Sequence, residues 1–120
     1  MTTRQEKVNE LLREEVSYIL RREFKDPRLG FVTVTGAEIS ADMRHAKIFV
    51  SIMGSEEEKQ RNMAVLKGAE SFTRQALAKR LKMKILPQIE FRLDSSVEHG
   101  VRIFELLEQV KREEAEKGGT

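Results

Sequence analysis

Apolar residues in the first part of the chain recur with the spacing of one helical face. They stand mostly three or four positions apart, at Val8, Leu11, Leu12, Val16, Ile19 and Leu20. This spacing predicts an amphipathic helix from Thr3 to about Phe24. Asp26-Pro27 ends the helix, because a residue that precedes proline is pushed out of the helical region, and Gly30 marks the turn that follows.

The next two stretches are typical of β-strands. Residues 31–39 are rich in β-branched side chains, and in residues 45–53 apolar side chains alternate with their neighbours, at Ala46, Ile48, Val50 and Ile52. Alternation of this kind predicts a strand with one buried face. The polar link 40–44 is short enough to join the two strands as an antiparallel hairpin, in which Ser40 or Asp42 bonds nearby backbone amides.

Residues 54–83 predict a helix with a bend. Gly54-Ser55 followed by three glutamates indicates a turn, an N-cap and a first helical turn whose dipole favours acids. An unbroken helix over residues 57–83 would be about 40 Å long, which is too long for a domain of this size. We therefore expect a joint at Gly68-Ala69-Glu70-Ser71, where Gly68 supplies backbone freedom and the Ser71 hydroxyl caps the next helix.

A third strand and a charged tail complete the pattern. Pro87 stops the helix, and Ile89, Phe91 and Leu93 alternate with polar residues. Apolar residues between Val101 and Val110 fit another helical stretch, whereas the residues after it are too charged and glycine-rich to fold by themselves. We therefore expect one α+β domain over residues 1–107 and a flexible tail over residues 108–120.

Composition narrows the class of protein. The 120 residues suffice for one domain, and 39% hydrophobic with 35% charged residues is typical of a soluble globular protein. The chain has no cysteine, which excludes disulfides and thiolate metal sites. It shows neither an apolar leader nor an apolar run long enough to cross a bilayer. These features predict a cytoplasmic protein.

Positive charge is concentrated in one segment. The net charge is only +2, but no acid occurs from Ser71 to Ile89, and this segment carries five bases, Arg74, Lys79, Arg80, Lys82 and Lys84. The other 17 bases and 20 acids leave −3 for the rest of the chain. A basic segment of this kind either forms an ordinary solvent-exposed surface or binds phosphates. The lack of acids among the bases favours phosphate binding.

The predicted order of elements, α-β-β-α-α-β, is that of the type II KH domain, an RNA-binding fold with a three-stranded sheet packed on helices. The loop that joins the two middle helices of that fold normally reads GXXG, and here no two glycines stand three positions apart. The helix after the joint would point its free amides at the joint, where a phosphate is favoured. Glu70 would repel a phosphate there.

The whole chain resembles the bacterial ribosome-binding factor A family. The resemblance covers about residues 3 to 107 and rests on four short motifs in order. These are Asp26-Pro27-Arg28, Ser40-x-Asp42 followed by Ala46-Lys47-Ile48-Phe49-Val50, Pro87-x-Ile89-x-Phe91-x-x-Asp94-x-Ser96, and Gly100-x-Arg102-Ile103. In that family a helix-kink-helix with the sequence Ala-x-Gly replaces the GXXG loop. Here Ala69-Glu70-Ser71 matches the alanine but not the glycine.

The resemblance implies a monomeric cytoplasmic assembly factor that binds the free or immature 30S small ribosomal subunit and its 16S rRNA. Such a factor assists late maturation of the subunit, including processing of the rRNA 5′ end, and is needed especially in the cold. It implies other assembly factors, including a GTPase, as partners, and neither catalysis nor a cofactor nor a small-molecule substrate. The family's binding surfaces correspond here to Arg74, Lys79, Arg80, Lys82, Lys84, Arg28, Arg44 and Lys47.

Two other classes of function leave weaker signals. An enzyme has few candidate groups, because His45 and His99 are expected on the surface and the adjacent side chains of residues 56–58 diverge on a helix, so that they cannot converge on a metal ion. The stronger rival is a generic interaction module of the same fold that docks another protein through the amphipathic stretch Val101–Val110. We expect no catalytic residue and no metal site.

Overall fold

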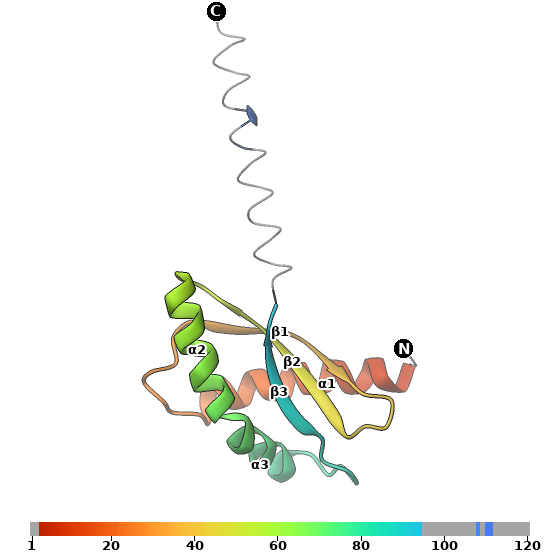
Figure 1. The fold of residues 1–120 in the computed structure, drawn as a ribbon. Helices are drawn as coiled ribbons and strands as arrows, with labels where there is room; N and C mark the ends of the chain where they lie inside the picture. The colour runs from red at the N-terminus through yellow and green to blue at the C-terminus, as the bar shows by residue number, and fades with distance from the viewer. Residues whose placement is uncertain (1–2, 95–107, 109, 112–120) are drawn as a thin grey trace, which may run out of the picture.

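The computed structural model describes residues 3–94, 108, 110 and 111. Its elements follow the predicted order, as Figure 1 shows: α1 (Thr3–Arg22), β1 (Val32–Ile39), β2 (His45–Ile52), α2 (Glu56–Gly68), α3 (Glu70–Arg80) and β3 (Gln88–Leu93). Within the described residues, no helix is both long and apolar enough to cross a membrane. The predicted boundary between residues 107 and 108, and the stretch from Val101 to Leu107, lie outside the described residues.

The three strands form one mixed sheet in the order β1-β2-β3. β1 pairs antiparallel with β2, so that Ile39 lies opposite Ala46, and the register shifts between Val34 and Gly36. β3 pairs parallel with β2, so that Ile89 also lies opposite Ala46. β2 is therefore the central strand, and β3, which closes the fold after both middle helices, is an edge strand.

The hairpin between β1 and β2 is held by the two side chains that the sequence nominated. Ser40 Oγ accepts the His45 N–H at 3.0 Å and donates to Asp42 Oδ1 at 2.6 Å. Asp42 Oδ1 also accepts the Arg44 N–H at 3.1 Å. Met43 adopts a left-handed conformation with φ of 62°, which the turn requires. The predicted hairpin and its polar bonds are confirmed.

One hydrophobic core lies between the sheet and the helices. The strands bury alternate side chains, so that one face of the sheet meets residues from all three helices. Leu12, Val16 and Ile19 of α1, Leu66 of α2 and Leu77 of α3 have no exposed surface, and they pack with Ile48 and Val50 of β2. The other sheet face carries polar side chains, which include Glu38, Lys47 and Glu90.

The joint between α2 and α3 is a single residue. α2 ends at Gly68, α3 begins at Glu70, and Ala69 between them has φ of −91° and ψ of −1°. The Ala69 N–H still bonds the carbonyls of Val65 and Leu66, at 3.1 and 2.9 Å. Helical hydrogen bonding thus continues almost to the bend, and Figure 1 shows α3 leaving α2 in a new direction.

Two predictions about the second of these helices are wrong. Ser71 is not its N-cap, because α3 begins at Glu70 with Ala69 in the cap position, and Ser71 lies exposed inside the helix. The Ala69 carbonyl instead accepts the N–H and the hydroxyl of Thr73, at 2.9 and 2.8 Å. The helix also ends at Arg80, short of residue 83, because Leu81 is already extended.

Candidate nucleic-acid interface

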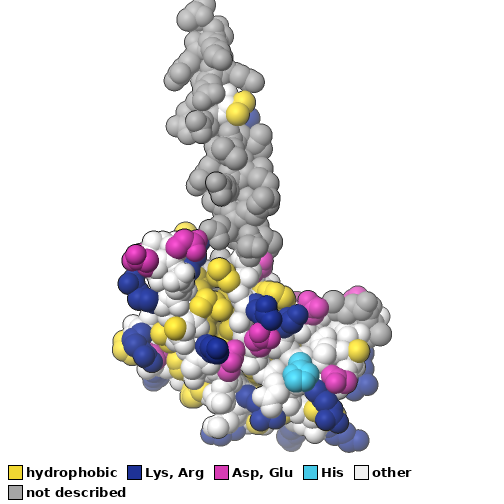
Figure 2. Space-filling view, viewed as in Figure 1, with side chains coloured by type: hydrophobic (Ala, Val, Ile, Leu, Met, Phe, Trp, Pro, Cys, Tyr) yellow, Lys and Arg dark blue, Asp and Glu magenta, His cyan; other side chains and the backbone are white. Residues whose placement is uncertain are grey.

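The basic segment follows α3 out of the helix and along the edge of the molecule. Lys79 lies in the last turn of α3, whereas Lys82 and Lys84 lie in the extended segment that leads to β3. All three are exposed, and no ion pair to any of them is found among the described residues. Figure 2 shows dark blue side chains along this lower edge with few magenta ones.

Arg80 belongs to the same segment, but its charge is offset. Its Nε donates to Glu15 Oε2 of α1 at 2.5 Å, and its Nη1 lies 3.6 Å from Glu23 Oε1. The guanidinium also lies over the ring of Tyr18, 4.0 Å from the centroid. The hydrogen bond to Glu15 raises the pKa of Arg80 above its ordinary value. Arg80 therefore ties α3 to α1 rather than presenting a free charge.

Arg74 is also committed to the fold. Its side chain is half-buried, and it donates from Nε to the Pro87 carbonyl and from Nη2 to the Leu86 carbonyl, both at 3.3 Å. It thus holds the chain that enters β3. Of the five bases that the sequence grouped together, the structure leaves Lys79, Lys82 and Lys84 without a partner in the described residues.

Glu70, at the joint, bonds the edge of the sheet. The Gln88 N–H donates to the carbonyl of Arg44, directly before β2, and the Asp94 N–H donates to that of Val50 in β2. The N–H of Phe91, an odd number of residues from each, therefore points away from β2. Glu70 Oε2 accepts that N–H at 2.9 Å. The first turn of α3 therefore carries a carboxylate engaged with β3, where the sequence suggested free amides for a phosphate.

The hairpin meets the basic segment at Lys84. This lysine lines a pocket of about 430 Å³ together with Arg4 of α1 and hairpin residues 41–43. Arg44, at the same hairpin, is exposed. Lys47 is less available, because it lies opposite Glu38 on one side and Glu90 on the other, on the face of the sheet away from the core.

Arg28 lies in the loop between α1 and β1. Its side chain is 74% exposed, and it donates to the carboxylate of Asp26 from Nε at 3.0 Å and from Nη2 at 2.6 Å. The Arg28 N–H adds a bond of 2.9 Å to Asp26 Oδ1. These bonds lower the pKa of Asp26 to about 2. Arg28 is thus held in place beside α2.

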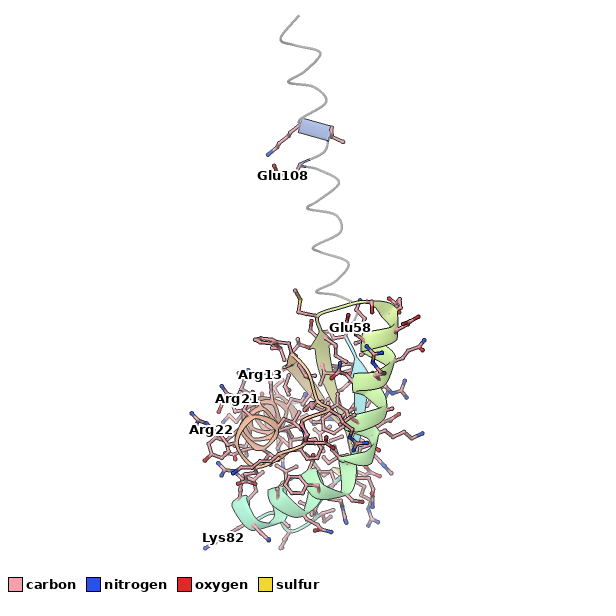
Figure 3. All side chains as sticks on the ribbon, turned by 90° about the vertical axis from the view of Figure 1, so that its left-hand side faces the viewer. Arg13, Arg21, Arg22, Glu58, Lys82 and Glu108 are labelled. Carbon is pink, nitrogen blue, oxygen red and sulfur yellow. The ribbon has the colours of Figure 1, made fainter. Side chains whose placement is uncertain are left out.

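The structure adds two arginines that the sequence did not nominate. Arg21 and Arg22 form the basic last turn of α1 and are exposed. Figure 3 shows them on the same side of the molecule as Lys82, which points away from the body at the end of α3. Contacts of Arg80 with α1 bring the two helices together. Basic residues in the last turn of the first helix were the available signal, but their nearness to α3 depends on tertiary packing.

The order and pairing of the elements define a class of protein: a type II KH-like domain in which a one-residue joint between two helices replaces the GXXG loop. The family model for ribosome-binding factor A matches residues 4–107. The chain belongs to the ribosome-binding factor A family.

Individual relatives agree in sequence and in fold. The ribosome-binding factor A of Halothermothrix orenii is 49% identical over 111 residues, which are 92% of this chain and 91% of that protein. The crystal structure of ribosome-binding factor A from Thermus thermophilus matches with a TM-score of 0.65 at 27% identity, over 74% of this chain and 94% of that one. A homology model of the Thermus thermophilus factor, fitted into the cryo-electron microscopy map of a 30S complex, matches with a TM-score of 0.60 at 28% identity, over 72% and 91% of the two chains.

Proposed function

We propose that this protein binds the free or immature small ribosomal subunit through its 16S rRNA and assists late maturation of that subunit. The observation that carries the proposal is the set of three exposed lysines, Lys79, Lys82 and Lys84, in a segment free of acids and without ion pairs in the described residues. Unpaired cations on one edge release counterions when phosphates bind there, which supplies affinity without sequence specificity. The family membership and the 30S complex of a relative support the choice of RNA.

The surface extends from the lysines in two directions. On one side it takes in Arg21 and Arg22 of α1, and on the other it reaches Arg4 and Arg44 beside the hairpin. Arg74 and Arg80 have a supporting role, because Arg74 bonds the carbonyls of Leu86 and Pro87 ahead of β3 and Arg80 pairs with Glu15 of α1. In more detail, the protein assists processing of the 16S rRNA 5′ end and is needed especially in the cold. It acts in the cytoplasm alongside other assembly factors such as a GTPase, and it catalyses no step itself.

Charge reversal on the lysines tests the binding surface. We expect Lys79→Glu with Lys82→Glu to weaken binding of purified small subunits about tenfold or more and to lower the salt dependence by roughly two phosphate contacts. The control is Lys7→Glu with Arg92→Glu, which changes net charge by the same amount at exposed positions on α1 and β3. Equal affinities for the two double variants would refute the assignment.

A cellular measurement tests the finer role. Cells that lack the protein are expected to accumulate small subunits whose 16S rRNA keeps an unprocessed 5′ end, more so at low temperature. The wild type and the control variant should restore processing, whereas the Lys79→Glu, Lys82→Glu variant should not. Normal 5′ ends in cells without the protein would remove the maturation role and leave only subunit binding.

A further inference from the structure

A second pocket lies between the α1–β1 loop and α2, on the other side of the joint from the three lysines. It has a volume of about 670 Å³, which is within the range of small-molecule sites. The lining residues come from the loop between α1 and β1, which lies beside α2 in Figure 1, and from α2 itself. The residues that the argument uses are Phe24, Arg28, Arg61, Ala64, Val65 and Gly68. Of the bases that the family resemblance nominated, only Arg28 lines this pocket.

The walls of the pocket are fixed by the fold itself. Asn62 of α2 accepts the Gly30 N–H on Oδ1 at 2.6 Å and donates from Nδ2 to the Glu58 carbonyl at 2.8 Å, which fastens the loop to the helix. The ring of Phe24 rests against Phe72, with centroids 5.5 Å apart. Because these contacts hold the pocket open without a ligand, an occupant would bind at little cost in ordering.

The lining combines apolar side chains with two arginines and two carboxylates, those of Asp26 and Glu58. Phe24, Ala64 and Val65 present carbon surface, and Arg61 is exposed without an ion pair in the described residues. Arg28 spends Nε and Nη2 on Asp26, and the described part of the chain offers no partner to its Nη1. An apolar or aromatic surface beside a guanidinium is the combination that binds the base and the phosphate of an unpaired nucleotide.

We propose that this pocket binds one unpaired nucleotide of RNA. The base lies against Phe24, Ala64 and Val65, and the phosphate contacts Arg61 and the free edge of Arg28. The carboxylate of Glu58, which also lines the pocket, can accept a hydrogen bond from a base amino group. The inference rests on the proposed function, since it gives the same RNA a second contact across the joint from the lysines.

Gly68 makes the pocket testable without disturbing the fold. It lines the pocket, its φ is not in the left-handed region, and a Cβ built on it would have no heavy atom within 4 Å. A larger side chain therefore enters the pocket rather than the core. Gly68→Leu should fill the space meant for the base, whereas Gly68→Ala should leave most of it open.

The experiment uses the full chain and two probes, a five-nucleotide unstructured RNA and purified small subunits. We expect Gly68→Leu to weaken the short RNA by about tenfold, the loss typical of one stacked base, and Gly68→Ala to bind within about twofold of the wild type. Amide resonances of Ala64 and Val65 should shift when nucleoside monophosphates are added to the wild type and stay unmoved in Gly68→Leu. Arg61→Gln should weaken binding of the short RNA severalfold, and this variant replaces Gly68→Leu in the test if the leucine variant folds poorly.

The outcomes separate this inference from the proposed function. Wild-type RNA binding by both Gly68→Leu and Arg61→Gln would overturn the pocket, even if Lys79→Glu with Lys82→Glu loses the subunit. Loss of subunit binding in Gly68→Leu with unchanged binding of the short RNA would point to a protein occupant and would also overturn it. Loss of the short RNA in Gly68→Leu, with subunit binding unaffected by the lysine reversals, would keep the pocket and reject the lysine surface.

Discussion

Glu70 and Phe91 are joined by a hydrogen bond between the helix joint and the edge of the sheet: Glu70 Oε2 accepts the Phe91 N–H at 2.9 Å. Arg74, one turn further along α3, donates to the Leu86 and Pro87 carbonyls. The two side chains bond backbone groups before and within β3, and an edge strand with satisfied groups is a poor template for pairing with another chain. The acid at the joint therefore has a structural role, which explains how the domain accommodates a carboxylate beside the surface proposed for RNA.

Substitution of Glu70 should separate this structural role from charge. Glu70→Ala leaves the Phe91 N–H without its partner and should lower the free energy of unfolding by about 1–3 kcal/mol, whereas Glu70→Gln keeps an acceptor and should cost about 1 kcal/mol or less. Chemical denaturation measures both values. Gln75→Ala, at an exposed position on the same helix, should stay within about 0.5 kcal/mol of the wild type. Equal stability of the Ala and Gln variants would contradict the role of the hydrogen bond.

The local sequence pattern was sufficient to predict the helices and strands but not to predict which side chains are free at the interface. Helical spacing, alternation and Asp26-Pro27 report on neighbours a few positions away, so all six elements and the hairpin could be predicted. Arg80 is paired because it contacts Glu15, which is 65 positions away in the sequence. Arg74 is engaged because it contacts carbonyls 12 and 13 positions away. A cluster of like charges in the sequence therefore overstated the number of free cations on the surface.

Arg80 and Lys79 are neighbours with different expected roles. Arg80→Met removes the ion pairs with Glu15 and Glu23 and should lower the Tm on the order of a few °C, while small-subunit affinity falls by less than about threefold. Lys79→Met should leave the Tm unchanged and weaken binding by more than Arg80→Met does, because its charge is free for phosphate. Calorimetry and a subunit-binding titration on the same samples provide the comparison. Similar binding losses in both variants would show that Arg80 also contacts the RNA.

Replacing the glycines near the two ends of α2 by alanine should change the stability of the protein in opposite directions. Gly68 lies in open space without a left-handed φ, so Gly68→Ala should stabilise the protein by about 0.5–1 kcal/mol through helix propensity and a less flexible unfolded chain. Gly54 has φ of 135°, and an added Cβ would collide with the Glu58 carboxylate, so Gly54→Ala should destabilise by about 1–3 kcal/mol. Denaturation midpoints measure both changes. A destabilising Gly68→Ala would mean that the joint needs glycine after all.

Two serines distinguish a real cap from a residue that only resembles one. Ser55 Oγ accepts the Glu58 N–H at 3.2 Å, so Ser55→Ala should cost about 1 kcal/mol. Ser71 caps nothing and lies inside α3, so Ser71→Ala should be neutral or stabilising by up to about 0.5 kcal/mol. The sequence predicted an N-cap at both serines, because the local sequence pattern of a serine before a helix is similar at the two positions. Only the unbroken backbone bonding at Ala69 excludes the second cap, and a cost of about 1 kcal/mol at both positions would contradict that geometry.

The pair of Asp26 and Arg28 predicts a dependence of stability on acid. The folded pKa of Asp26 is lowered from 3.8 to about 2 by its bonds to Arg28, so the ionised carboxylate stabilises the fold above the ordinary pKa and this contribution disappears as the pH falls towards 2. Asp26→Asn removes the titrating group. The Tm difference between the wild type and Asp26→Asn should therefore be constant above about pH 5 and shrink progressively between about pH 4 and pH 2. Melting curves across this range measure the difference, and a gap that stays constant down to pH 2 would show that the carboxylate gains no stability from Arg28.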